Sequence, residues 1–175
     1  MALRKASSYS KKHVVPFTRI SKIKSRSYIK TVPPQKIVKF YMGIAKNTFP
    51  HRLSVLSEHR VQIRDNALEA CRQFIHKQLD TGLAGQYYFR VIPFPHHIQR
   101  ENKMLTGAGA DRMQTGMQLS FGKSVGKAAI VNPGDPIFVI DLPTEKAVVL
   151  ARVLIRQIRS KLPGTVKVAY EKRQF

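Results

Sequence analysis

The chain has 175 residues, enough for one compact domain or for one domain with an extension. Its 31 Lys and Arg residues outnumber its 10 Asp and Glu residues, which gives a formal net charge of +21 and a pI near 10.6. Such self-repulsion gives a monomeric enzyme no advantage in folding, so the charge predicts a polyanionic partner. Nucleic acid is the first candidate, and an anionic membrane surface is the second.

The sequence argues against a membrane-spanning or a disulfide-bonded protein. No stretch approaches the roughly 20 apolar residues that span a bilayer, and no apolar segment of a secretory signal follows the basic start. The single cysteine, Cys71, excludes an internal disulfide and a multi-cysteine metal site. It lies in an apolar helical pattern, where a buried, unreactive thiol is expected. We expect a soluble, cytoplasmic protein that needs no metal or other cofactor.

Residues 1–35 are basic, rich in small polar residues and free of acidic residues. The first carboxylate in the chain is Glu58, and 13 Lys or Arg residues precede it. An organelle transit peptide has a similar composition, but the basic character continues through Lys46, beyond a strand-like segment. Interleaved aromatic residues would let the segment order itself on RNA, whose phosphates pair with Lys and Arg and whose bases stack on rings. The RNA-binding residues predicted for this extension are Arg4, Lys5, Lys11, Lys12, Arg19, Lys22, Lys24, Arg26 and Lys30.

From residue 36 the sequence has the patterns of a packed domain, which we expect to span residues 36–175. A helix is expected to begin at Asp65 or Asn66, either of which could cap it, and to stop at Gly82. Its apolar positions follow the i, i+3/i+4 rule at Ala67, Leu68, Cys71, Phe74, Ile75 and Leu79. β-branched and aromatic residues predict three early strands, at residues 36–42, 52–59 and 86–94.

A long segment with little periodicity, residues 95–116, follows the third of these strands. A structureless segment of this length in a compact domain is either functional or disordered. Its basic residues Arg100, Lys103 and Arg112 lie among small residues that let a partner approach the backbone closely. We therefore expect a functional central loop at about 95–116.

Three enzyme interpretations of the central region fail on their spacing. Gly107 and Gly109 could begin a dinucleotide fingerprint, but Arg112 stands in the third position and no βαβ unit surrounds it. Adjacent His96 and His97 on an extended segment point to opposite sides, so a metal site is not expected there. No Ser or Cys lies in an elbow motif with a matched His, so a nucleophile–base pair is not predicted.

The stretch GMQLSFGKS at 116–124 ends like the phosphate loop of an ATPase or GTPase. That motif needs a glycine where Met117 stands, and a helix after it. Apolar and polar residues alternate through the middle of the stretch, as they do in a half-buried strand, and a further strand is expected at 128–133. We therefore predict a tight basic turn between two strands, which brings Lys123 and Lys127 near one another.

A second helix is expected from Thr144, as its cap, to Leu162, and the dipeptide Pro163-Gly164 ends it. A closing strand follows at 165–170. The apolar face of the helix is formed by Ala147, Val148, Ala151, Leu154, Ile155 and Ile158. Its polar face carries Arg152, Arg156 and Arg159, which could dock on RNA or be solvated helix positions. Two helices among short strands predict an α+β fold, with the helices packed on antiparallel strands, rather than a doubly wound sheet.

Four short runs in the middle of the chain have a recognisable order and spacing: ENKML at 101–105, GADR at 109–112, GM at 116–117 and FGK at 121–123. Further runs are PFTR at 16–19, YIKTVPPQKI at 28–37, MG at 42–43, QIR-NALEA at 62–70 and LP at 162–163. Together they resemble the large-subunit ribosomal protein family called L-ten-e in archaea and eukaryotes, the counterpart of bacterial L-sixteen and also known as the QM protein. The resemblance covers essentially the whole chain, and the short C-terminal end is similar to the archaeal form.

The resemblance implies a compact α/β hammerhead fold and a structural role in the large ribosomal subunit. It implies binding to 23S-type rRNA near the peptidyl transferase centre, beside the 5S rRNA region and neighbouring large-subunit proteins, with no membrane and no small-molecule substrate. The central loop would reach toward the acceptor end of P-site tRNA. By position, the loop residues are Arg100, Asn102, Lys103, Met104, Gly107, Gly109, Asp111 and Arg112, while Lys123 and Lys127 join the basic extension as rRNA-binding residues.

One departure from the family pattern lies beside the central loop. Family members usually have proline after FGK and a small residue three positions later, whereas Ser124 and Lys127 stand there in this chain. The change removes some turn rigidity and adds one positive charge. An RNA-binding regulator that acts outside the ribosome remains the alternative function.

Overall fold

The computed structural model of the protein describes residues 23, 25, 31–45, 49–101, 107 and 123–173. These residues form two antiparallel sheets and two α-helices, which confirms the α+β class predicted from the sequence. The larger sheet has the strand order β1-β4-β7-β2-β8. In that order, its strands are Tyr41–Gly43, Tyr88–Val91, Pro136–Leu142, His51–Ser57 and Val166–Lys172.

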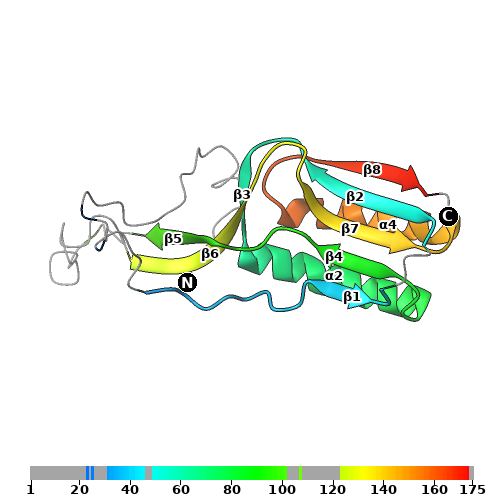
Figure 1. Cartoon of the computed structure of the whole chain (residues 1–175), viewed down its shortest axis with the longest axis horizontal. Coiled ribbons are helices and arrows are strands. Elements are labelled where there is room, and N and C mark those ends of the chain that lie inside the picture. Colours follow the sequence, from blue (N-terminus) through cyan, green and yellow to red (C-terminus); the bar gives the residue numbers. More distant parts are fainter. Residues whose placement is uncertain are drawn as a thin grey trace.

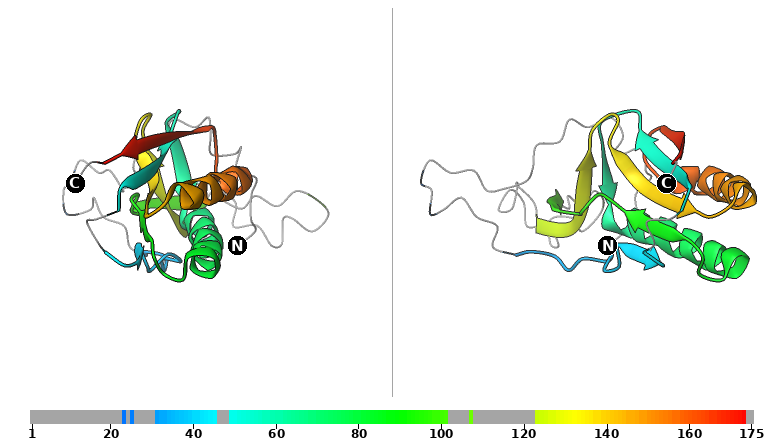
Figure 2. Two further views of the ribbon diagram at one scale, coloured as in Figure 1. Left: turned by 90° about the vertical axis from the view of Figure 1, so that its right-hand side faces the viewer. Right: turned by 45° about the vertical axis from the view of Figure 1, so that its right-hand side comes forward.

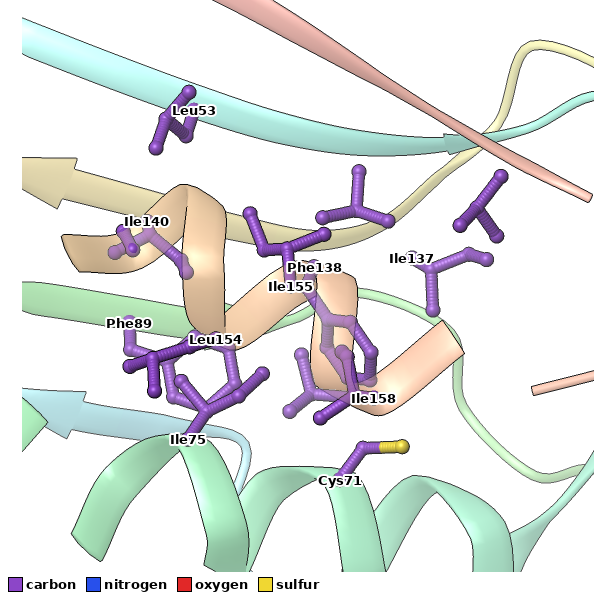
Figure 3. Packing of buried hydrophobic residues seen from close by; sticks show 14 of the residues in the cluster. Leu53, Cys71, Ile75, Phe89, Ile137, Phe138, Ile140, Leu154, Ile155 and Ile158 are labelled. Atoms are coloured by element: carbon purple, nitrogen blue, oxygen red, sulfur yellow. The ribbon is translucent and has the colours of Figure 1, made fainter. Parts of the chain in front are cut away.

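Both helices cover the same face of the large sheet, as the end-on view in Figure 2 shows. Helix α2 spans Asp65–Leu83, and helix α4 spans Glu145–Ile158 and continues as the 3-10 turn η3, Arg159–Lys161. Apolar residues of the two helices meet those of β4 and β7 in one cluster (Figure 3). On the other face, β2 and β4 carry the half-buried side chains that alternate with the buried ones, while β7 is buried along nearly its whole length.

The smaller sheet consists of β3 (Val61–Arg64), β6 (Lys123–Val131) and β5 (His97–Glu101), in that order. It extends away from the helix-covered body (Figure 1). Hydrogen bonds tie the junction between the sheets: the amide of Ser57 donates to the carbonyl of Asp135, and the amide of Gly134 donates to the carbonyl of Ser57. The end of β2 is thereby held against the turn that joins β6 to β7.

The second helix matches its prediction closely. The hydroxyl of Thr144 accepts a hydrogen bond from the amide of Ala147, so the predicted cap is confirmed. All six residues of the predicted apolar face are buried. The α-helix ends at Ile158 rather than at Leu162, because the last turn tightens into η3.

The first helix begins at Asp65, as predicted, but its cap and its end differ from the prediction. It follows Arg64, which makes no side-chain capping bond, and the carboxylate of Asp65 instead accepts the amides of Asn66 and Lys36. Gly82 lies inside the helix, so it is not the predicted stop. The helix ends at Leu83 and is followed by Ala84, which takes the left-handed conformation with φ 45°.

Cys71 lies on the buried face of α2, pointing into the cluster of Figure 3. Burial raises the pKa of its thiol to about 12, so the thiol stays protonated at neutral pH. The buried, unreactive cysteine expected from the sequence is therefore confirmed.

Several strand predictions were wrong in extent. The strand predicted at 36–42 covers only Tyr41–Gly43, and the one at 86–94 covers Tyr88–Val91. Strand β2 and the closing strand β8 confirm their predictions to within two residues at each end. Strand β7 lies at the centre of the large sheet and is absent from the predicted elements.

The region around the central loop needs the largest corrections. Its first part is not structureless, because His97–Glu101 forms β5 and pairs with β6. The tight turn predicted around Lys123 and Lys127 is wrong, since both lysines lie on the single nine-residue strand β6, which also absorbs the strand expected at 128–133. Strand β6 is continuous because it pairs with β3 on one side and β5 on the other. The half-buried strand expected in the middle of the 116–124 stretch lies outside the described residues.

Candidate nucleic-acid interface

Two carboxylates of the described residues, Asp141 and Glu69, are already paired with arginines. Asp141 on β7 accepts hydrogen bonds from Arg52 at 2.7 and 3.0 Å and from Arg90 at 3.3 Å, and its side chain is only 7% exposed. The hydrogen bond from Arg52 to Asp141 raises the pKa of Arg52. On α2, the hydrogen bond from Arg72 lowers the pKa of Glu69. These ion pairs identify arginines that are held by the fold and are poorly placed to bind an external anion.

A hollow between α4 and β8 is lined by arginines that are not paired with any carboxylate that the structure describes. Its volume is about 310 Å³, and it is lined by Arg152, Ile155, Arg156, Arg159 and Val168. The guanidinium of Arg152 lies 5.7 Å from the centre of the Tyr170 ring, and Arg159 donates to the carbonyl of Val166 at 3.3 Å. These two contacts orient their arginines without neutralising the charge.

Within the described part of the chain, Arg156 lacks the kind of contact that orients the other two arginines of the hollow. It forms no hydrogen bond, ion pair or ring contact with any residue that the structure describes. Among the residues that the structure describes, no carboxylate lines the hollow. Three guanidinium groups around one concave surface, with an apolar floor from Ile155 and Val168, form a site suited to a phosphate-bearing chain.

The root of the central loop is built by β5 and β6. Glu101 pairs with Lys123 and Arg100 pairs with Ser124, so the two strands bring both ends of residues 102–122 together. A bulge falls between Gln99 and Arg100, where the register with β6 shifts. Lys123 is exposed and Lys127 is half-buried. Basic side chains therefore flank the root, although the two lysines are four residues apart on one strand.

The structure describes few of the residues predicted to bind RNA. Arg100, Lys123 and Lys127 lie together on β5 and β6, and Gly107 is exposed with φ 138°. The other predicted residues lie outside the described part of the chain: Arg4, Lys5, Lys11, Lys12, Arg19, Lys22, Lys24, Arg26 and Lys30 in the extension, and Asn102, Lys103, Met104, Gly109, Asp111 and Arg112 in the loop.

Two other kinds of site find no support in the described residues. No group of three His, Cys, Asp or Glu side chains among them could hold a metal ion. None of the helices they form is both long enough and apolar enough to cross a bilayer.

The chain is similar to known ribosomal proteins along most of its length. The family described as ribosomal protein L16p/L10e matches residues 15–169. Similar proteins, each named large ribosomal subunit protein uL16, occur in Hyperthermus butylicus (45% identity, covering 85% of this chain and 79% of the relative) and in Thermofilum pendens (40% identity, 99% and 100%). The relative of the same name in Staphylothermus marinus is 40% identical, covering 98% of this chain and 95% of its own length.

These matches place the chain among the ribosomal proteins, which are structural constituents and not enzymes. The chain belongs to the ribosomal protein L16p/L10e family, in its archaeal form. The resemblance found in the central sequence runs is thereby confirmed. The failure of the phosphate-loop, dinucleotide and nucleophile patterns agrees with this membership.

Proposed function

We propose that the chain binds 23S-type rRNA near the peptidyl transferase centre of the large subunit, beside the 5S rRNA region and neighbouring ribosomal proteins. The observation that carries this proposal is the hollow of Arg152, Arg156 and Arg159 between α4 and β8. Each arginine that meets a phosphate displaces condensed counterions, which favours binding. The acid-free extension adds further positive charge. Recognition rests mainly on RNA shape, because A-form grooves admit little reading of base edges.

We further propose that the loop between β5 and β6 helps to position the acceptor arm of P-site tRNA. Its two ends are paired at the tip of the small sheet, with Arg100 and Lys123 at the root. A loop fixed in this way can be presented to tRNA by a rigid body that is docked on rRNA. The mechanism is therefore positioning, with no chemical step carried out by the protein.

The rRNA-binding proposal is tested with Arg156→Gln. We expect the variant to bind deproteinised large-subunit rRNA more weakly and to lower the slope of log K against log salt concentration by about 1, because one phosphate contact is lost. Equilibrium filter binding over a series of salt concentrations measures both quantities. Arg72→Gln is the matched control: Arg72 is held by Glu69 at 2.6 Å, so its loss should leave the slope unchanged. Equal slopes for the wild-type protein and Arg156→Gln would contradict the assignment of the hollow.

The loop proposal is tested by deleting residues 104–115. Because Glu101 and Lys123 remain paired, we expect the shortened protein to fold and to co-sediment with large subunits through a high-salt wash. We expect translation, or late maturation of the subunit, to be impaired. Normal translation by ribosomes that carry the shortened protein would contradict the tRNA assignment. Release of the full-length protein into the free pool at moderate salt would instead favour an RNA-binding regulator outside the ribosome.

A further inference from the structure

Exposed apolar and aromatic side chains lie on the segments that form the β1–β4 edge of the large sheet. Among the described residues, Val38, Tyr41, Ile44, Ile92 and Phe94 all expose large side chains there. The segments that carry them are joined, because β1 pairs with β4 and the amide of Val91 donates to the carbonyl of Phe40. The Phe40 and Phe94 rings are stacked with centroids 5.6 Å apart. Phe40 packs against the buried core, whereas Tyr41 is the next residue along the chain and faces the opposite side of the sheet.

Tyr41 is the most exposed aromatic side chain at this edge of the sheet. It is 68% exposed, and its cross-strand partner on β4 is Arg90. Tyr88 lies two residues from Arg90 and therefore faces the same side of the sheet. The guanidinium of Arg90 lies 5.2 Å from the centre of the Tyr88 ring and is hydrogen-bonded to Asp141. Tyr41 thus stands beside a planar cation that is already fixed in place, on the face that the helices leave uncovered (Figure 2).

The charge around Tyr41 favours a polyanion over a protein. Strands β1, β4 and β7 contain one carboxylate, Asp141, which Arg52 and Arg90 already share. Lys36 and Lys39 are exposed on the segment that leads into β1. A protein strand that added to this edge would gain a short ladder, because β1 has only three residues. An aromatic ring among basic residues is instead the arrangement on which nucleic-acid bases stack.

We propose that Tyr41 is a stacking platform for an unpaired base of the large-subunit rRNA, with Lys39 binding an adjacent phosphate. The inference rests on the proposed rRNA binding but assigns a second site, on the opposite face of the sheet from the arginine hollow. The two sites would bind RNA through different interactions. The hollow acts through charge, whereas Tyr41 acts through the stacking of one ring on a base. A stacked base contributes to affinity without releasing counterions.

The test measures the binding of the full-length protein to deproteinised large-subunit rRNA over a series of salt concentrations. Tyr41→Ala is expected to weaken binding about 5- to 150-fold, the range for loss of one stacked base, and to leave the salt slope unchanged. Tyr41→Phe keeps the ring and should stay within about threefold of wild type. Val38→Ala is the matched control, because Val38 is 79% exposed and lies three residues before Tyr41 but has no ring. Circular dichroism confirms that each variant is folded.

Each result separates this inference from the proposed function. Wild-type affinity in Tyr41→Ala, with Arg156→Gln still weakened, would overturn the stacking site and leave rRNA binding intact. If Tyr41→Ala kept its RNA affinity but was incorporated poorly into subunits, Tyr41 would contact a neighbouring protein instead. That result would also overturn the inference. A lowered salt slope in Tyr41→Ala would contradict stacking as the cause. Absence of rRNA binding by the wild-type protein would overturn both proposals.

Discussion

Replacing Gly43 with alanine is expected to destabilise the protein by about 3 kcal/mol or more. Gly43 has φ +84°, and a Cβ atom placed there would lie 2.0 Å from the carbonyl oxygen of Tyr87. That oxygen accepts the amide of Ile44 at 2.9 Å, so the backbone of Tyr87 cannot move away without loss of a hydrogen bond. The variant must therefore bear both the left-handed strain and a backbone clash. Urea unfolding followed by circular dichroism measures the change.

Gly85→Ala provides the matched control for this effect. Gly85 has nearly the same φ, +81°, but a Cβ atom there would meet nothing within 4 Å. It should show only the cost of a left-handed alanine, about 1 kcal/mol. The difference between the two variants isolates the close approach of β1 to Tyr87. Equal losses of stability in the two variants would contradict the packing described for this edge of the sheet.

Asp141→Asn is expected to lower the free energy of unfolding by about 2–3 kcal/mol. The substitution keeps the shape of the side chain but removes the charge that Arg52 and Arg90 share, and two half-buried guanidinium groups then face each other without an anion. The expected loss lies below that for a fully buried pair, because both arginines retain some contact with water. Chemical unfolding at neutral pH measures it.

Glu145→Gln is the corresponding control on the surface. Glu145 is 77% exposed, and its carboxylate lies 3.8 Å from the ammonium group of Lys172. An exposed pair at this distance contributes little, so the variant should remain within about 0.5 kcal/mol of wild type. If Asp141→Asn were equally mild, the Arg52–Asp141–Arg90 cluster would not be stabilising the centre of the sheet.

Helix α4 was predictable because its signals are local. Thr144 supplies the cap, and the apolar residues recur with the period of one helical face. Strand β7 is a continuous, mostly apolar run, because it is central in the sheet and buried along nearly its whole length, and such a run lacks the alternation that distinguishes a strand from a buried helix segment. Strand β5 contains a single large aliphatic residue, Ile98, and is held by its pairing with β6 rather than by its own pattern. Both strands are fixed by contacts between residues far apart in sequence.

The candidate sites were likewise predictable only where their residues are related by local spacing. The three arginines of α4 and η3 share one face by helical spacing, so their common direction follows from the sequence. The floor of the hollow comes from Val168 on β8, which no local pattern brings to α4. Likewise, the register that sets Tyr41 opposite Arg90 depends on the pairing of segments almost 50 residues apart. The individual residues were visible in the sequence, but their association was not.

The hydrogen-bonded junction at Ser57 has a mechanical consequence. Because Ser57 is hydrogen-bonded to both Gly134 and Asp135, a hinge motion of the small sheet against the large one would strain these bonds. A tilt of the helix-covered body would therefore also move the tip of β5 and β6, which extends away from it (Figure 1). The orientation of the body would therefore determine where the paired residues Glu101 and Lys123 lie.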